Sequence, residues 1–170
     1  MKKSTILIIA VISILAVLFL CAYFEEPQTS QQEKNQGQEI VQDQYQDEEF
    51  ISWMANQVST IGVYANLTVD AIVNDELYLA KSYADQGYDY CIDALSDITD
   101  FKISPDVMEF YSYGYSFLVN MKWTFFYFSL YADTHSLADL HEANEYFEDA
   151  THDLENMTLW LKCREAEKCP

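Results

Sequence analysis

The sequence has little of what β-structure requires. Among its 170 residues are only 4 glycines and 3 prolines. It contains none of the dipeptides that begin tight hairpins, such as Asn-Gly or Asp-Gly, and no stretch alternates apolar and polar residues as a half-buried strand does. These absences argue against a β-rich fold and favour a helical one.

Positive charge is also scarce. The chain carries 9 lysines and arginines against 28 acidic residues, a formal net charge of -19. Such a surface repels phosphate backbones, so nucleic-acid binding by charge is excluded. The acidic surface fits a solvated face, a cation-rich medium or a basic partner.

Motifs that carry catalysis are missing as well. There is no glycine-rich phosphate loop, no nucleophile elbow, no zinc-type cysteine spacing and no calcium loop of the EF-hand pattern. We therefore expect a protein that is not an enzyme and that holds no cofactor.

The N-terminus is the most apolar part of the chain. Lys2 and Lys3 precede an uncharged run from Ile6 to Phe24, which is about the 20 residues that a membrane-spanning helix needs. The lysines are expected to stay in the cytoplasm, which places the rest of the chain outside. Residues 1–24 are thus predicted to be a signal anchor, inserted in the membrane through residues 4–24.

Two alternatives remain for this segment. Cleavage near Cys21 would make the run a signal peptide and the protein secreted. Lipid modification of Cys21 is the other alternative, although the bulky Leu20 before it is unlike the small residue that lipoproteins carry there.

Residues 25–48 differ sharply from the run before them. They are rich in glutamine and acid and hold almost nothing that could be buried. Because such a composition cannot offset the entropy cost of ordering, we expect a disordered, flexible spacer. The domain itself is predicted to occupy residues 49–170.

Apolar residues recur every three or four positions in four stretches of that domain, at residues 50–72, 77–98, 107–128 and 137–161. Asn74-Asp75 is expected to be a turn, Ser104 to cap the third helix, and Ser136 with Asp139 to form a capping box on the fourth. Helices of similar length with short joints favour an all-α, up-down four-helix bundle.

The third stretch allows a rival reading. The segment from Phe110 to Ala132 is apolar enough to be considered as a second membrane span. Lys122 in mid-segment costs about 2.5–3.5 kcal/mol on insertion scales, and Asn120 adds to that penalty, so a helix of the bundle is favoured.

The fourth helix holds the one group of residues that resembles a set of metal ligands. His141, Glu145, Glu148 and His152 are four, three and four residues apart, so a helix stacks them on one stripe that could chelate a divalent metal. That stripe lies away from the apolar face and no second helix supplies a matching histidine, so a solvated face is the favoured interpretation.

Glycines near the middles of three helices indicate either a cavity or a close approach of helices. Each costs up to about 1 kcal/mol in a helix interior, so some compensating gain is expected. A cavity would bind a small ligand, but close approach is favoured because ligand pockets are few in any protein. The glycines and the tyrosines that would line the cavity are Gly62, Gly87, Gly114, Tyr64, Tyr88, Tyr111 and Tyr115.

The third helix has more aromatic residues than one buried face can hold. Trp123, Phe126 and Tyr127 project away from its inward set, and exposed aromatics of this size often mark a contact surface. The partner could be another copy of the chain, a different protein, the bilayer surface or a glycan. The alternative is that the helix is central and buries these rings inside the domain.

Two kinds of modification follow from the expected location. Asn66 and Asn156 begin N-glycosylation patterns, and both are expected on outward faces. Cys163 and Cys169 are expected to pair outside the cytoplasm, with Cys91–Cys169 as the rival pairing.

The sequence therefore favours a membrane-tethered, extracytoplasmic helical module that binds a ligand, a protein partner or a second copy of itself. A metal-binding bundle and a purely structural envelope protein are the alternatives.

Overall fold

The computed structural model describes residues 45–166, and these are all-α. Four long helices follow one another: α2 (Asp47–Val73), α3 (Leu77–Asp97), α4 (Met108–Thr134) and α5 (Leu137–Glu165). Two short 3₁₀ turns, Ile98–Asp100 and Pro105–Val107, lie in the α3–α4 connection. The predicted four helices are confirmed. The predicted anchor (1–24), most of the predicted spacer (25–48) and Cys169 lie outside the described residues.

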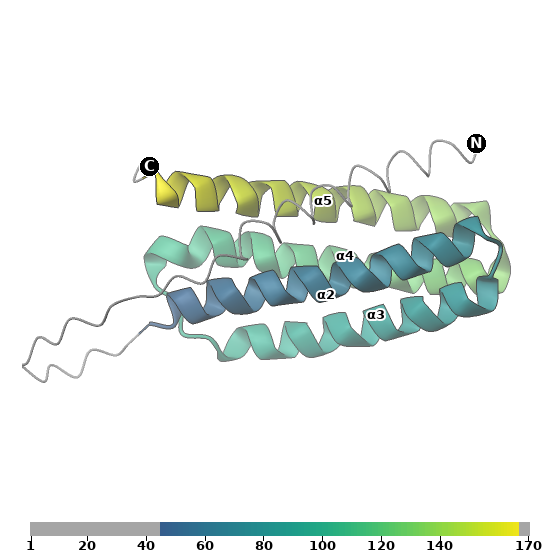
Figure 1. The fold of residues 1–170 in the computed structure, drawn as a ribbon, viewed down its shortest axis with the longest axis horizontal. Helices are drawn as coiled ribbons and strands as arrows, with labels where there is room; N and C mark the ends of the chain where they lie inside the picture. The colour runs from purple at the N-terminus through teal and green to yellow at the C-terminus, as the bar shows by residue number, and fades with distance from the viewer. Residues whose placement is uncertain (1–44, 167–170) are drawn as a thin grey trace, which may run out of the picture.

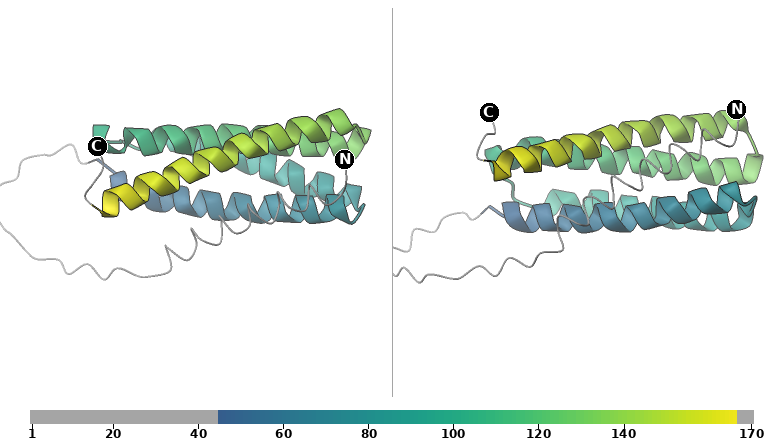
Figure 2. Two further views of the ribbon diagram at one scale, coloured as in Figure 1. Left: turned by 90° about the horizontal axis from the view of Figure 1, so that it is seen from above. Right: turned by 45° about the horizontal axis from the view of Figure 1, so that its top comes forward.

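The helices run up and down in two layers, α2 beside α3 and α4 beside α5 (Figure 1, Figure 2). Helix α4 packs along both α3 and α5, whereas α2 packs mainly against α3. Seen from above, α5 crosses the other layer obliquely, and only its C-terminal end approaches the start of α2 (Figure 2). At that end Arg164 pairs with Glu48.

The apolar repeat explains why each helix faces as it does. On α2, Phe50, Met54 and Ile61 are fully buried, as their spacing predicts. On α4, Leu118 and Phe125 are fully buried in the same core. An exception is Leu137, which was predicted to point inward but is among the most exposed apolar residues because it begins α5 beyond the end of the core.

The end of the bundle where α2 begins is fastened to the α3–α4 connection. The backbone N–H of Gln46 donates to the carbonyl oxygen of Lys102 (2.9 Å), and Ser104 donates to Asp47 from both its N–H (2.9 Å) and its hydroxyl (2.6 Å). Ser104 precedes Pro105 as predicted, but its hydroxyl does not cap the helix that follows. The predicted cap position is therefore confirmed, whereas the side-chain cap is absent and the hydroxyl donates to a carboxylate distant in sequence.

The opposite end holds the α2–α3 and α4–α5 turns. Asp75 and His135 both take the left-handed conformation there, with φ of 64° and 56°. Ser136 occupies the cap position of α5 but makes no side-chain cap. The expected capping box is wrong, because Asp139 instead accepts a hydrogen bond from the Thr134 hydroxyl at 2.5 Å.

Within residues 45–166, no helix is long and apolar enough to cross a membrane. The segment from Phe110 to Ala132, which was considered as a second span, belongs to α4 and is covered by that finding.

Candidate interaction surface

The three aromatic residues singled out on the third helix form one ring cluster. Trp123 contacts Phe126 edge-on with ring centroids 5.5 Å apart, and Phe126 contacts Tyr127 in the same way at 5.3 Å. Tyr146 of α5 stacks on Tyr127 at 5.7 Å and on Trp123 at 6.2 Å. The cluster therefore joins α4 to α5, and its rings hold one another in place.

The cluster is neither fully buried nor freely exposed. Phe126 keeps 39% of its surface exposed, while Trp123 and Tyr127 are half-buried. Tyr88 of α3 contacts the Phe126 ring at 6.2 Å, so the cluster extends toward the α3 side as well. The expectation that these rings form an exposed contact surface and the alternative that they are buried inside the domain each hold in part. Neighbouring rings cover one part of the cluster, and another part stays exposed.

Electrostatics around the rings are mixed. The Lys122 ammonium lies over the Trp123 ring, 4.6 Å from its centroid, which is cation–π geometry. Partial burial raises the pKa of the Tyr127 hydroxyl, and the nearby Glu142 carboxylate raises that pKa further. Tyr127 therefore stays protonated at neutral pH and can donate a hydrogen bond.

Further apolar side chains lie on the same side of α4. Met108 and Tyr115 are exposed and are spaced from Phe126 by nearly whole helical turns, which places all three on one face. We call Met108, Tyr115, Trp123, Phe126 and Tyr127 the α4 face. Tyr88 of α3 and Tyr146 of α5 cover part of this face, and Met108, Tyr115 and Phe126 are its exposed members.

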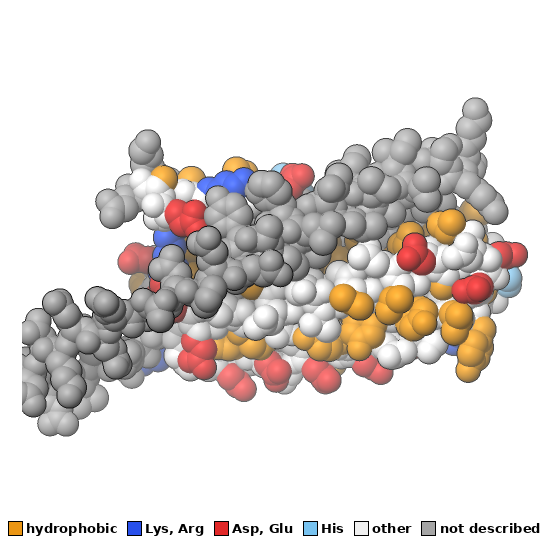
Figure 3. All heavy atoms as spheres, in the orientation of Figure 1, with side chains coloured by type: hydrophobic (Ala, Val, Ile, Leu, Met, Phe, Trp, Pro, Cys, Tyr) orange, Lys and Arg blue, Asp and Glu red, His pale blue; other side chains and the backbone are white. Residues whose placement is uncertain are grey.

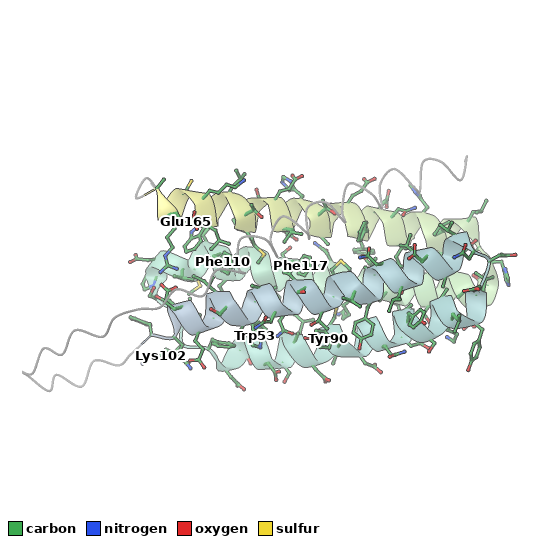
Figure 4. All side chains as sticks on the ribbon, viewed as in Figure 1. Trp53, Tyr90, Lys102, Phe110, Phe117 and Glu165 are labelled. Carbon is green, nitrogen blue, oxygen red and sulfur yellow. The ribbon has the colours of Figure 1, made fainter. Side chains whose placement is uncertain are left out.

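The bundle also has a cleft, at a different place from the cavity that was considered as an alternative. Residues of α2, α4 and α5 line it, and Phe117, the α4 residue among them that is labelled in Figure 4, lies between α2 and α5 in that view. None of the four tyrosines predicted to line a cavity borders it. The cavity volume is about 40 Å³, enough for a few water molecules and too small for a typical organic ligand. The residues that line the cleft are Val58, Ile61, Gly62, Ala65, Asn66, Phe117, Met121, Phe147, Ala150, Thr151 and Leu154.

Two of the three glycines serve close helix packing instead. A Cβ at Gly87 would lie 2.6 Å from the Phe125 ring, and one at Gly114 would lie 3.0 Å from the Met54 sulfur. At both positions a side chain would crowd a residue of the neighbouring helix, so glycine suits them. This agrees with the favoured interpretation, a close approach of helices. Gly62 borders the cleft.

The His/Glu stripe of α5 does not assemble into a ligand set. His141 pairs with Glu145 at 3.3 Å, whereas His152 lies nearest Glu155 at 3.8 Å rather than beside Glu148. All these paired side chains are more than half exposed. Among the residues that the structure describes, no group of three potential metal ligands comes together.

A polar cluster that the sequence analysis missed joins α3 to α4. The Lys81 ammonium lies 3.0 Å from the Asp133 carboxylate, 3.6 Å from that of Asp85 and 3.0 Å from the Ser129 hydroxyl. Ser129 in turn donates to Asp85 at 2.5 Å. Hydrogen bonding to Asp133 is the main cause that raises the pKa of Lys81, so the lysine is charged and cannot serve as a base. Because its members lie on two different helices, the spacing of residues within either helix could not predict this cluster.

Four of the residues considered for glycosylation or disulfide bonding lie within the described part of the chain, and none of the four is classed as exposed. Asn66 is half-buried and borders the cleft, so the expectation that it faces outward is wrong. Asn156 is also half-buried. Cys91 is fully buried, and burial raises the pKa of its thiol to about 12, which makes it inert. Cys163 is half-buried, and its proposed bond to Cys169 stays a prediction.

In comparisons with known proteins, no protein-family model matches the chain, and no curated protein or solved structure shows significant similarity to it.

Proposed function

We propose that the chain is a membrane-tethered, extracytoplasmic binding module that captures a protein partner through the α4 face. One observation carries this proposal: Trp123, Phe126 and Tyr127 contact one another ring against ring, while Phe126 stays 39% exposed and the other two stay only half-buried. Tryptophan and tyrosine are the residues most enriched at the energetic centres of protein interfaces.

Pre-organisation supports the same role. A ring already fixed by its neighbours loses little rotamer freedom on binding, so more of the contact energy becomes affinity. Tyr146 stacks on both Trp123 and Tyr127, and Tyr88 supports Phe126 from the other side. The α4 face is thus a rigid platform.

The tether is the second part of the proposal. The run from Ile6 to Phe24 would hold the module at the membrane, with residues 25–44 as the spacer between the two. Intact mass spectrometry of the protein from its native membrane tests this part: a full-length mass supports an anchor, and loss of the first 20 or so residues would replace it with a cleaved signal.

Site-specific photo-crosslinking tests the α4 face. A benzoylphenylalanine at position 126 of the full-length chain in its native membrane should yield one discrete adduct. The same probe at Asp89, which is exposed on α3, is the matched control and should yield none. Replacing Trp123 and Tyr127 by serine should abolish the adduct at 126 while the helical circular dichroism is kept.

Equal labelling from positions 126 and 89 would refute the α4 face as a specific interface. An adduct of twice the chain's mass would identify the partner as a second copy.

A further inference from the structure

A second apolar surface lies away from the α4 face, on α2 and α3. Five large apolar residues in the second half of α2 and the first turn of α3 are 37% to 85% exposed, and Tyr78 is the most exposed of them. Figure 3 shows hydrophobic side chains gathering over α2 and α3 toward the α2–α3 turn. We call these five residues the α2–α3 patch: Val63, Leu67, Val73, Tyr78 and Leu79.

The residues of this patch do not belong to the core-facing sides of their helices. Leu67 is 38% exposed although the next residue, Thr68, is fully buried, and Leu79 is 39% exposed although Ala80 is fully buried. Both helices therefore already present a complete inward face to the bundle. The patch is an additional apolar surface on their outer side, and large exposed patches of this kind mark interaction sites.

The surroundings of the patch are strongly acidic. Asp70, Asp75 and Glu76 are exposed around the turn, and a row of acidic side chains runs along α3 below the patch (Figure 3). Lys81 is the only lysine or arginine in either helix, and two aspartates already balance its charge. The patch thus has an apolar centre and a negative rim.

An apolar centre with a negative rim favours some classes of partner over others. A second copy would bring two acidic rims together, and anionic lipids or nucleic acids would be repelled in the same way. A neutral apolar surface would leave the rim charges unpaired. A helix with leucine-like residues on one side and lysine or arginine on the other would satisfy both parts.

We propose that the α2–α3 patch docks a cationic, amphipathic helix of another protein. Its apolar residues lie against Leu67, Tyr78 and Leu79, and its basic residues meet the acidic rim. Because the patch and the α4 face are on different helices, the module can bind two partners, which makes it an adaptor. This inference does not depend on what the α4 face binds.

A designed peptide serves as the probe: a fluorescein-labelled 18-residue helix of leucine and lysine with leucines every three or four positions. The full-length chain is held in phosphatidylcholine nanodiscs, and empty nanodiscs give the baseline. A scrambled peptide of the same composition and a leucine–glutamate peptide are the matched controls. Fluorescence anisotropy should show binding of the amphipathic lysine peptide alone, weakening as salt rises.

Three variants locate the site. Replacing Leu67, Tyr78 and Leu79 by serine should weaken binding by at least about tenfold, because a few central apolar contacts dominate such interfaces. Replacing Asp70 and Asp75 by asparagine together with Glu76 by glutamine should also weaken it and flatten the salt dependence. Replacing Ile92, Leu137 and Leu159 by serine removes as many exposed apolar residues outside both surfaces and should change nothing.

Two results would overturn the proposal: equal binding of the scrambled peptide, which would reduce the effect to charge alone, or unchanged binding by the Leu67, Tyr78 and Leu79 variant. A monomer–dimer equilibrium that this variant abolishes in sedimentation would assign the patch to self-association instead. Serine at Trp123 and Tyr127 should leave peptide binding intact, so failure here is distinct from failure of the α4 face.

Discussion

Replacing Gly87 by alanine tests how tightly α3 and α4 pack. An alanine Cβ at this position would lie 2.6 to 2.7 Å from three carbons at the tip of the Phe125 ring. Phe125 is itself fully buried, so its ring has no free space into which it can move. The helices would have to separate, or the ring would have to leave its preferred rotamer.

Two opposing effects set the magnitude. Alanine is favoured over glycine in a helix interior by up to about 1 kcal/mol. Overpacking a close-packed core costs typically about 1–3 kcal/mol. Because three ring atoms would be closer than real Cβ contacts allow, the steric cost should prevail, and we expect a net loss of about 1–2 kcal/mol of folding free energy.

Equilibrium urea unfolding of the full-length chain, followed by helical circular dichroism, measures this loss. Replacing Phe125 by leucine removes the tip of the ring and provides the control. In a double-mutant cycle the glycine substitution should cost less beside leucine than beside phenylalanine. If alanine at position 87 instead raised the unfolding midpoint, the close approach of α3 and α4 at this residue would be refuted.

Three further predictions concern the helix ends and the polar cluster. Replacing His135 by glycine should stabilise the fold by about 0.5–1 kcal/mol, seen as a higher urea midpoint, because glycine adopts the left-handed conformation without steric cost. Replacing Ser104 by alanine removes the hydroxyl bond to Asp47 and should lower folding stability by about 1–2 kcal/mol in the same assay, leaving the circular dichroism unchanged. The pKa of Lys81 is raised above 10.5, mainly by its bond to Asp133, so the stability that this lysine contributes should be complete below that value and lost as pH rises through the raised pKa. Replacing Lys81 by methionine should therefore reduce the alkaline decline of stability in thermal melts, and the raised pKa values of Cys91 and Tyr127 account for part of the remainder.

The helices and their inward faces could be predicted from the sequence because both follow from local periodicity. Phe50, Met54 and Ile61 on one helix, and Leu118 and Phe125 on another, are buried as their spacing requires. The same reasoning placed Trp123, Phe126 and Tyr127 away from the core. Phe126 is indeed exposed, whereas Trp123 is half-buried and Tyr127 packs against the core.

What periodicity does not encode is how one helix lies against another. The position of the cleft, between α2 and α5 and away from the tyrosines considered for a cavity, depends on the oblique crossing of α5. Ser104 occupies the predicted cap position, but the bond from its hydroxyl to Asp47 could not be predicted because only the tertiary fold brings Asp47 near. The Lys81 cluster was missed for the same reason, since Ser129 and Asp133 lie on a different helix.

The acidity of the chain and its two apolar surfaces are best understood together. A protein with an exposed Tyr78 at one patch and an exposed Phe126 at another would be prone to associate with copies of itself. A net charge of -19 opposes that association, because every pairing of two copies brings like charges together. The repulsion disappears for a neutral partner and becomes attraction for a basic one. The negative charge would therefore disfavour binding of a second copy and favour binding of a basic partner. Raising the salt concentration should promote self-association and weaken binding of the cationic helix.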